Sequence, residues 1–156
     1  MATRQLTPHF TLEELCLSET AVRAGIDNTP PADVVANLLR LAKMLEKVRA
    51  LLKRPIHITS GFRCPELNAR IGGSKTSAHL EGRAADFICP AFGTPYVVAK
   101  KIAAARLGYD QMIHEYGRWV HIAVPRVNER ADRELLSIFE PGKYLAGLTE
   151  LNERRA

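Results

Sequence analysis

The sequence has few cysteines and no long hydrophobic run, and each shortage excludes a class of protein. Its three cysteines are widely and irregularly spaced, so they form neither a disulfide framework nor a paired-cysteine zinc motif. No apolar run approaches the roughly 20 residues that span a bilayer, and we expect no membrane insertion. The opening MATRQLTPHFTLEEL lacks an apolar segment, so we expect synthesis in the cytoplasm without a signal peptide.

The charge balance is basic, with a formal net charge of +5 over 156 residues. Such a charge suits an anionic partner, such as nucleic acid, a membrane surface or bacterial cell wall, although solubility alone would also explain it. The Lys and Arg residues are dispersed and are not interleaved with aromatic residues, so we expect no nucleic-acid partner. The hydrophobic fraction of 46% and the charged fraction of 25% are typical of a globular protein.

Three segments have the sequence pattern of helices. Thr11 and Glu14 have the spacing of a capping box at a helix start. Apolar residues at steps of three and four predict a long amphipathic helix that ends before Pro55, namely Val34, Leu38, Leu41, Leu45, Val48 and Leu52. Thr94 and Pro95 predict the start of a further helix, which we expect to end at Gly108.

Alternating or β-branched runs predict strands over residues 56–60, 84–89, 110–116, 119–124 and 133–139. Hairpin connections between them favour an α+β fold, in which a central antiparallel sheet is flanked by helices. No internal repeat or low-complexity linker divides the chain. We therefore expect one domain over residues 1–156, with its core at about 10–140 and a weakly patterned tail at 141–156.

Three polar side chains near the expected sheet have the chemistry of a metal site. A catalytic zinc ion is typically held by three protein ligands, and the fourth position is left for water. His79 and Asp86 in SAHLEGRAAD, together with His121 in WVHIAV, supply such a set. Gly82 allows the bend that would bring a loop residue at 79 close to a strand residue at 86.

These residue types also have ordinary structural roles. A histidine between Val120 and Ile122 is more often a hydrogen-bonded residue of a sheet than a metal ligand. An aspartate in a stretch such as GRAAD is usually a turn or salt-bridge residue. Spacing alone therefore leaves both interpretations open.

Two longer segments resemble peptidase family M15, the zinc D-Ala-D-Ala peptidases. They are ITSGFRCPELNARIGGSKTSAHLEGRAADF and YDQMIHEYGRWVHIAV. The residues that carry the resemblance are Ser60, Gly61, Phe62, Arg63, Ser77, His79, Gly82, Ala84, Asp86, Glu115, Trp119 and His121. The similarity extends from about Phe10 to Val124 and is greatest to the small phage- and prophage-associated branch. It implies a fold like that of the D-Ala-D-Ala peptidases and of the hedgehog signalling domain.

The resemblance also implies roles for individual residues. One zinc ion would be held by His79, Asp86 and His121, and Glu115 would be the general base for the attacking water. Arg63 would bind a substrate carboxylate or stabilise the oxyanion, with a surface salt bridge as the alternative. Ser77 would orient a ligand or the substrate, or else cap a turn.

The direction in which Glu115 points depends on the connection between its strand and that of His121. With a strict two-residue turn at Gly117-Arg118, His114 would lie opposite His121 and Glu115 would face away. We therefore predict a three-residue loop or a bulge, for which Gly117 could supply a positive φ. A regular two-residue turn would transfer the role of base to His114. Cys64, beside Arg63, is left out of the ligand set because three ligands are already present.

The expected function is that of a zinc metallopeptidase acting on peptidoglycan. It would trim a terminal D-Ala as a carboxypeptidase or cut a stem or cross-link as an endopeptidase. A phage or prophage lysin, released through a pore or carried in a phage particle to the cell wall or periplasm, would fit this activity. The alternatives are a non-catalytic zinc-containing binding module and a structural phage protein of the same fold. The role of residues 125–156 and the oligomeric state stay open.

Overall fold

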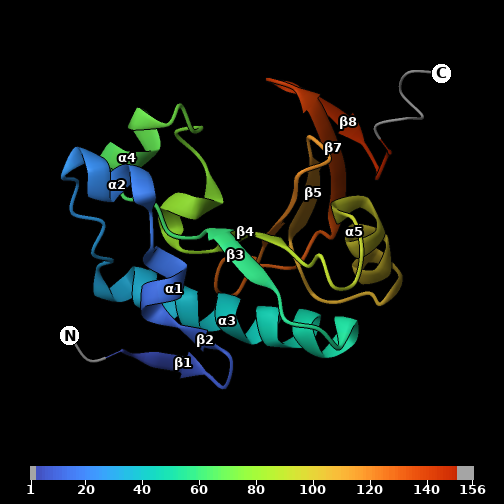
Figure 1. Ribbon diagram of the computed structural model, residues 1–156, viewed down its shortest axis with the longest axis horizontal. Coiled ribbons are helices and arrows are strands. Elements are labelled where there is room, and N and C mark those ends of the chain that lie inside the picture. The colour runs from blue at the N-terminus through green and yellow to red at the C-terminus, as the bar shows by residue number, and fades with distance from the viewer. Residues whose placement is uncertain (1–2, 151–156) are drawn as a thin grey trace.

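A six-stranded sheet is the centre of the fold in the computed structural model, which describes residues 3–150 (Figure 1). Its strand order is β3-β4-β6-β5-β7-β8, and every neighbouring pair except β5 and β7 is antiparallel. The strands are β3 His57–Ser60, β4 Ala84–Ile88, β5 Gln111–Glu115, β6 Trp119–Ala123, β7 Glu134–Glu140 and β8 Lys143–Ala146. Helices flank this sheet, so the predicted α+β fold is confirmed.

The parallel pairing of β5 with β7 departs from the expected antiparallel pattern, and the strand order explains it. Because Gln111 pairs with Ala123, β6 ends beside the start of β5, and the chain then crosses to the other side of β5 at that end. The backbone N–H of Arg133 donates to the Tyr109 carbonyl at 3.2 Å, and that of Glu134 donates to Asp110 at 2.9 Å. The strand β7 therefore begins where β5 begins and runs in the same direction.

Two helices cover one face of the sheet. The helix α3 Ala32–Leu52 buries all six of the predicted apolar residues. The helix α5 Pro95–Ala104 begins at the predicted Thr94 cap, whose hydroxyl accepts from the Val97 N–H. It ends four residues before Gly108, because Arg106 has a φ of +54° that a right-handed helix does not allow. Val98 and Ile102 of α5 pack in one core cluster with the residues of α3 and of the sheet.

Shorter elements lie around the β3 edge of the sheet and along α3 (Figure 1). They are β1 Gln5–Thr7, β2 Phe10–Thr11, α1 Leu12–Cys16, α2 Glu19–Ala24, α4 Pro65–Arg70 and the 3-10 helix η1 Ala78–Glu81. The Thr11 hydroxyl accepts from the Glu14 N–H at 3.1 Å, as the capping pattern predicts. In the described part of the chain, no helix combines the length and apolar character needed to cross a membrane.

The strand β8 lies within residues 141–156, for which the sequence predicts a weakly patterned tail. Its four residues, KYLA, are all exposed and show no alternation of polar and apolar side chains. The hairpin partner β7 determines their conformation, because Ser137 pairs with Leu145 and Ile138 pairs with Tyr144. The sheet therefore extends beyond the predicted core at residues 10–140.

Gly61 follows β3 and lies between the end of α1 and the loop that carries η1. Its carbonyl oxygen accepts from Nδ1 of His79 at 2.7 Å, and the next residue, Phe62, donates its N–H to the Leu15 carbonyl at 2.7 Å. A Cβ at position 61 would overlap the Leu15 carbonyl oxygen. Only glycine therefore allows the backbone to pass this closely.

We expect Gly61→Ala to destabilise the fold by about 1–3 kcal/mol, because backbone atoms must separate to admit the methyl group. Thermal unfolding monitored by circular dichroism measures this change. Gly108→Ala is the matched control, since a Cβ there meets nothing within 4 Å. Equal melting temperatures for the two variants would contradict the close approach at Gly61.

Candidate metal centre and groove

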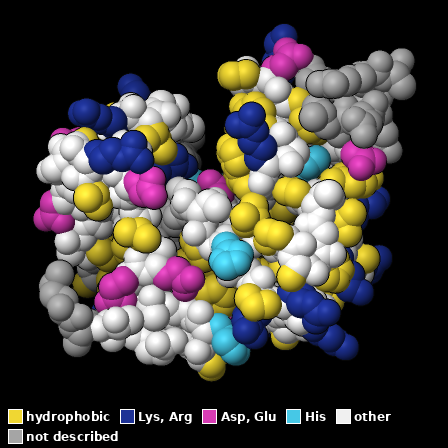
Figure 2. All heavy atoms as spheres, in the orientation of Figure 1, with side chains coloured by type: hydrophobic (Ala, Val, Ile, Leu, Met, Phe, Trp, Pro, Cys, Tyr) yellow, Lys and Arg dark blue, Asp and Glu magenta, His cyan; other side chains and the backbone are white. Residues whose placement is uncertain are grey.

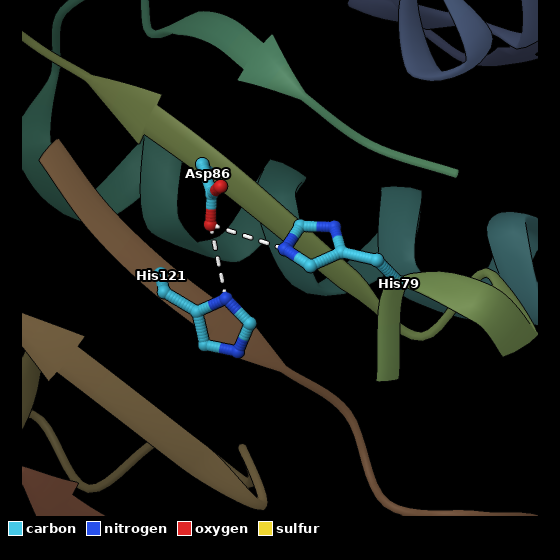
Figure 3. Close-up of side chains that lie close together, drawn as sticks. All are labelled: His79, Asp86 and His121. Atoms are coloured by element: carbon cyan, nitrogen blue, oxygen red, sulfur yellow. Dashed lines mark hydrogen bonds and ion pairs between the residues drawn. The ribbon is translucent and has the colours of Figure 1, made fainter. Parts of the chain in front are cut away.

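Three polar side chains from separate elements meet on the face of the sheet opposite α3 and α5. His79 comes from η1, Asp86 from β4 and His121 from β6, where Asp86 and His121 are directly paired residues. Oδ1 of Asp86 lies 3.3 Å from Nε2 of His79 and 2.9 Å from Nδ1 of His121. Figure 3 shows both rings directed at this carboxylate. Their potential ligand atoms all lie within 4.8 Å of one another.

The orientation of His79 is determined by its backbone surroundings. Because a carbonyl oxygen only accepts, the bond to Gly61 places a proton on Nδ1 and leaves Nε2 free toward Asp86. Ser77 caps η1, since its hydroxyl accepts from the His79 N–H at 3.2 Å. Gly82 ends η1 with a φ of +70°, and a Cβ there would lie 2.8 Å from Cγ1 of Val34. The bend expected at Gly82 is therefore present.

The cluster is shielded from solvent. His79 and His121 are 2% and 7% exposed, and burial alone would raise the pKa of Asp86. The two neighbouring imidazoles outweigh burial and hold the pKa of Asp86 well below its usual value. The carboxylate is therefore ionised at neutral pH and faces two ring nitrogens.

This donor set fits a divalent transition metal ion. Two imidazole nitrogens and one carboxylate oxygen are ligands that zinc accepts, although they would also suit other divalent ions. Metal-binding histidines usually donate their second N–H to a carbonyl or carboxylate, as His79 does to Gly61. Within residues 3–150, no other group of three His, Cys, Asp or Glu side chains lies close enough to share one ion. We infer that His79, Asp86 and His121 would hold the metal.

Glu115 faces this cluster because of the loop that follows it. In the ladder between β5 and β6, Glu115 pairs with Trp119 and Ile113 pairs with His121, so three residues connect the strands. Two of them, Tyr116 and Gly117, have φ values of +57° and +68°. The predicted three-residue irregularity is confirmed. It places Glu115 on the face of His121, with Oε1 3.9 Å from Nδ1 of that histidine.

His114 lies on the opposite face of the sheet. Its Nδ1 donates to the Thr149 carbonyl at 2.9 Å, and its ring contacts Tyr96 and Phe139. This histidine therefore cannot replace Glu115 as a base for chemistry at the His-Asp-His cluster.

Burial raises the pKa of the Glu115 carboxyl to about 7, and the charge of Asp86 adds to this effect. His121, the neighbouring indole of Trp119 and the charge of Arg63 oppose it. A carboxyl group with a pKa near 7 can both accept and release a proton at neutral pH. A cation beside it would lower this pKa and favour the ionised, proton-accepting form.

Arg63 lies beside the cluster at the exit from β3. Its backbone N–H donates to the His79 carbonyl at 3.1 Å. Burial lowers the pKa of the guanidinium, whereas the charges of Asp86 and Glu115 raise it. Its Nε is buried and has no hydrogen-bond partner among the described residues. Arg63 therefore has an unused donor in a groove that holds two carboxylates.

The groove around these side chains has a volume of about 930 Å³. Figure 2 shows the surface hollowed between the part formed by α2 and α4 and the part formed by β5, β7 and β8. One wall is the segment from Gly72 to His79, and the opposite wall includes Leu136, Ile138 and Tyr144. Sequence reasoning missed the second wall, because residues 134–146 carry no motif and are brought to the site only by the sheet.

A network of charged side chains links η1 to the chain after β6. The sequence does not indicate this network. The guanidinium of Arg126 binds Glu81 through two bonds of 2.9 and 3.1 Å, and Arg83 donates to the same carboxylate at 3.0 Å. Nη1 of Arg83 also donates to the Val124 carbonyl at 2.8 Å. These contacts hold η1, and therefore His79, against the strand of His121.

A sheet backed by helices, with a His-Asp-His cluster and a facing glutamate on its open side, is an arrangement suited to a metallopeptidase. The family model of peptidase M15 matches residues 8–123, and the chain belongs to this family. None of the curated proteins compared with the chain matches it. The family match ends at the last residue of β6, so β7 and β8 lie beyond it.

We expect His121→Ala to weaken zinc binding by at least about 100-fold, because it removes one of three ligands. Isothermal titration of the metal-free protein with zinc, with circular dichroism as a folding check, measures the change. Glu115→Gln is the matched control and should keep the wild-type affinity within about threefold. Loss of zinc in Glu115→Gln, with retention in His121→Ala, would show that the ligand set is wrong.

Proposed function

We propose that this chain is a zinc peptidase that hydrolyses D-amino-acid-containing peptide bonds of peptidoglycan stem peptides or cross-links. The observation that carries the proposal is the position of Glu115, which faces the buried His-Asp-His cluster from the neighbouring strand. Membership of peptidase family M15 supports the reaction class. The proposed substrate rests on the motif resemblance, and the net charge of +5 suits an anionic wall.

A zinc ion held by His79, Asp86 and His121 would supply Lewis acidity and lower the pKa of water in the groove. Glu115 takes a proton from the attacking water as its oxygen forms a bond to the peptide carbonyl carbon. When the carbon–nitrogen bond breaks, Glu115 returns this proton to the leaving amine. Both transfers use one carboxyl group, and a bound cation would lower its pKa from about 7 and favour the proton-accepting form that the first transfer needs.

Arg63 is the group proposed to bind the negative charge of the substrate. Its unpartnered Nε–H and planar guanidinium suit either the carbonyl oxygen, as charge develops on it, or a terminal carboxylate. The first role would serve an endopeptidase as well as a carboxypeptidase, and the second only a carboxypeptidase. The Ser77 hydroxyl accepts a hydrogen bond from the His79 N–H. Ser77 also lines the groove, where it would contact the substrate.

The proposed biological setting is a phage or prophage lysin that acts on the cell wall after release through a pore or delivery by a phage particle. Peptidoglycan is then the partner, with neither nucleic acid nor membrane insertion involved. The basic charge would concentrate the protein at an anionic wall, and this attraction would weaken as ionic strength rises.

Zinc-loaded protein incubated with purified peptidoglycan should release fragments whose masses identify the cleaved bond. We expect Glu115→Gln to reduce the rate at least about 100-fold, because a neutral amide cannot take the proton from water. Mass spectrometry of the soluble products measures both results. Glu19→Gln, at an exposed glutamate on α2, is the matched control and should keep the wild-type rate.

Absence of products from several chemical types of peptidoglycan, for wild type and Glu115→Gln alike, would contradict the proposed activity. A protein that binds zinc and wall fragments under those conditions without cutting them would be a binding module of the same fold.

A further inference from the structure

A row of side chains crosses four strands of the sheet on the groove face. Trp119 of β6 pairs with Glu115 of β5, Glu115 pairs with Ile138 of β7, and Ile138 pairs with Tyr144 of β8. Directly paired residues share one face of a sheet, and neighbouring strands lie roughly 4.8 Å apart. Tyr144 is therefore two strands, or about 10 Å, from Glu115, and both line the groove.

Tyr144 is unusual among the aromatic side chains because it is 56% exposed. Partial burial raises the pKa of its phenol, and electrostatic repulsion from Glu115 and Tyr116 raises it further. The hydroxyl is therefore protonated at neutral pH and can donate a hydrogen bond. An exposed tyrosine beside a polar groove offers both an apolar ring and a donor to a ligand.

Two further aromatic side chains lie at this end of the groove. The rings of Tyr116 and Trp119 have centroids 5.7 Å apart and an interplanar angle of 48°. Both residues line the same groove as Tyr144. Tyr116 is held to β7, because its N–H donates to the Ile138 carbonyl at 2.7 Å. The β7–β8 hairpin, the β5–β6 loop and β6 thus each contribute an aromatic side chain to the groove beside Glu115.

We propose that Tyr144, together with Tyr116 and Trp119, forms the subsite that binds the substrate residue adjoining the cleaved bond. The inference rests on the proposed peptidase function and adds a specificity residue from outside the family match at residues 8–123. Because Glu115 belongs to the same cross-strand row, the occupant lies directly beside the reacting bond. The occupant is therefore peptide rather than the sugar chain to which a stem peptide is attached.

The neighbouring residue Leu145 provides a matched control. Side chains alternate along β8, and Leu145 pairs with Ser137 in the row that contains His114 and Val120. That row faces away from the groove. Leu145 is 36% exposed, so its truncation removes apolar surface on the same strand without changing the groove.

The test is steady-state hydrolysis of a sugar-free stem peptide by zinc-loaded protein. Tyr144→Ala should raise KM about 10-fold and leave kcat within about twofold, because a contact made equally before and during reaction affects binding alone. Tyr144→Phe should give an intermediate KM, since it keeps the ring and loses the donor. Leu145→Ala should match the wild type.

A second readout does not depend on catalysis. Trp119 is the single tryptophan of the chain, so its fluorescence reports peptide binding to metal-free protein. Weaker binding to Tyr144→Ala than to Leu145→Ala, with equal melting temperatures, would support the subsite.

Wild-type kinetics and binding in Tyr144→Ala would overturn the inference and leave the peptidase function intact. An effect confined to sugar-bearing substrates would overturn its assignment to peptide. A wild-type protein that neither cuts nor binds stem peptide would overturn the proposed function and this inference together.

Discussion

The pairing of β4 with β6 is the constraint on which the site depends. It places Asp86 opposite His121, and the carboxylate of the first lies 2.9 Å from the ring of the second. Successive side chains of a strand point to opposite faces, so a slip of one residue would turn either side chain toward the helices. The flanking residues oppose such a slip, because Val120 and Ile122 are fully buried against the helix-covered face. Core packing thereby maintains the geometry of the polar cluster.

The remaining groups reach this pair through local backbone features. The three-residue connection after β5 turns Glu115 toward His121, and a shorter turn would have presented His114 instead. The carbonyl of Gly61 orients His79, while the Glu81 network attaches η1 to the chain after β6. Each feature acts on one side chain, and together they converge on Asp86. The backbone that carries Glu115 and the three potential metal ligands is therefore fixed by contacts with more than one element.

Much of the fold and of the candidate site could be predicted from the sequence, because the sequence patterns that indicate them are local. The helix α3 follows from its apolar spacing, and the loop at Tyr116–Arg118 follows from alternation along two adjacent strands. The parallel pair β5/β7 and the strand β8 could not, because the position of each depends on which sheet edge is left free. For the same reason, no sequence pattern indicates a role for Tyr144. Its position in the groove is a consequence of pairing across four strands.

The central claim is that His79, Asp86 and His121 form one metal centre, and that Glu115 acts there as a base without being a ligand. The most direct measurement is a crystal structure of the zinc-loaded protein with anomalous data collected on both sides of the zinc absorption edge. We expect one anomalous peak within about 2.0–2.3 Å of the two imidazoles and the Asp86 carboxylate, with Glu115 beyond ligand distance. A peak elsewhere, or one bound directly by Glu115, would contradict the account.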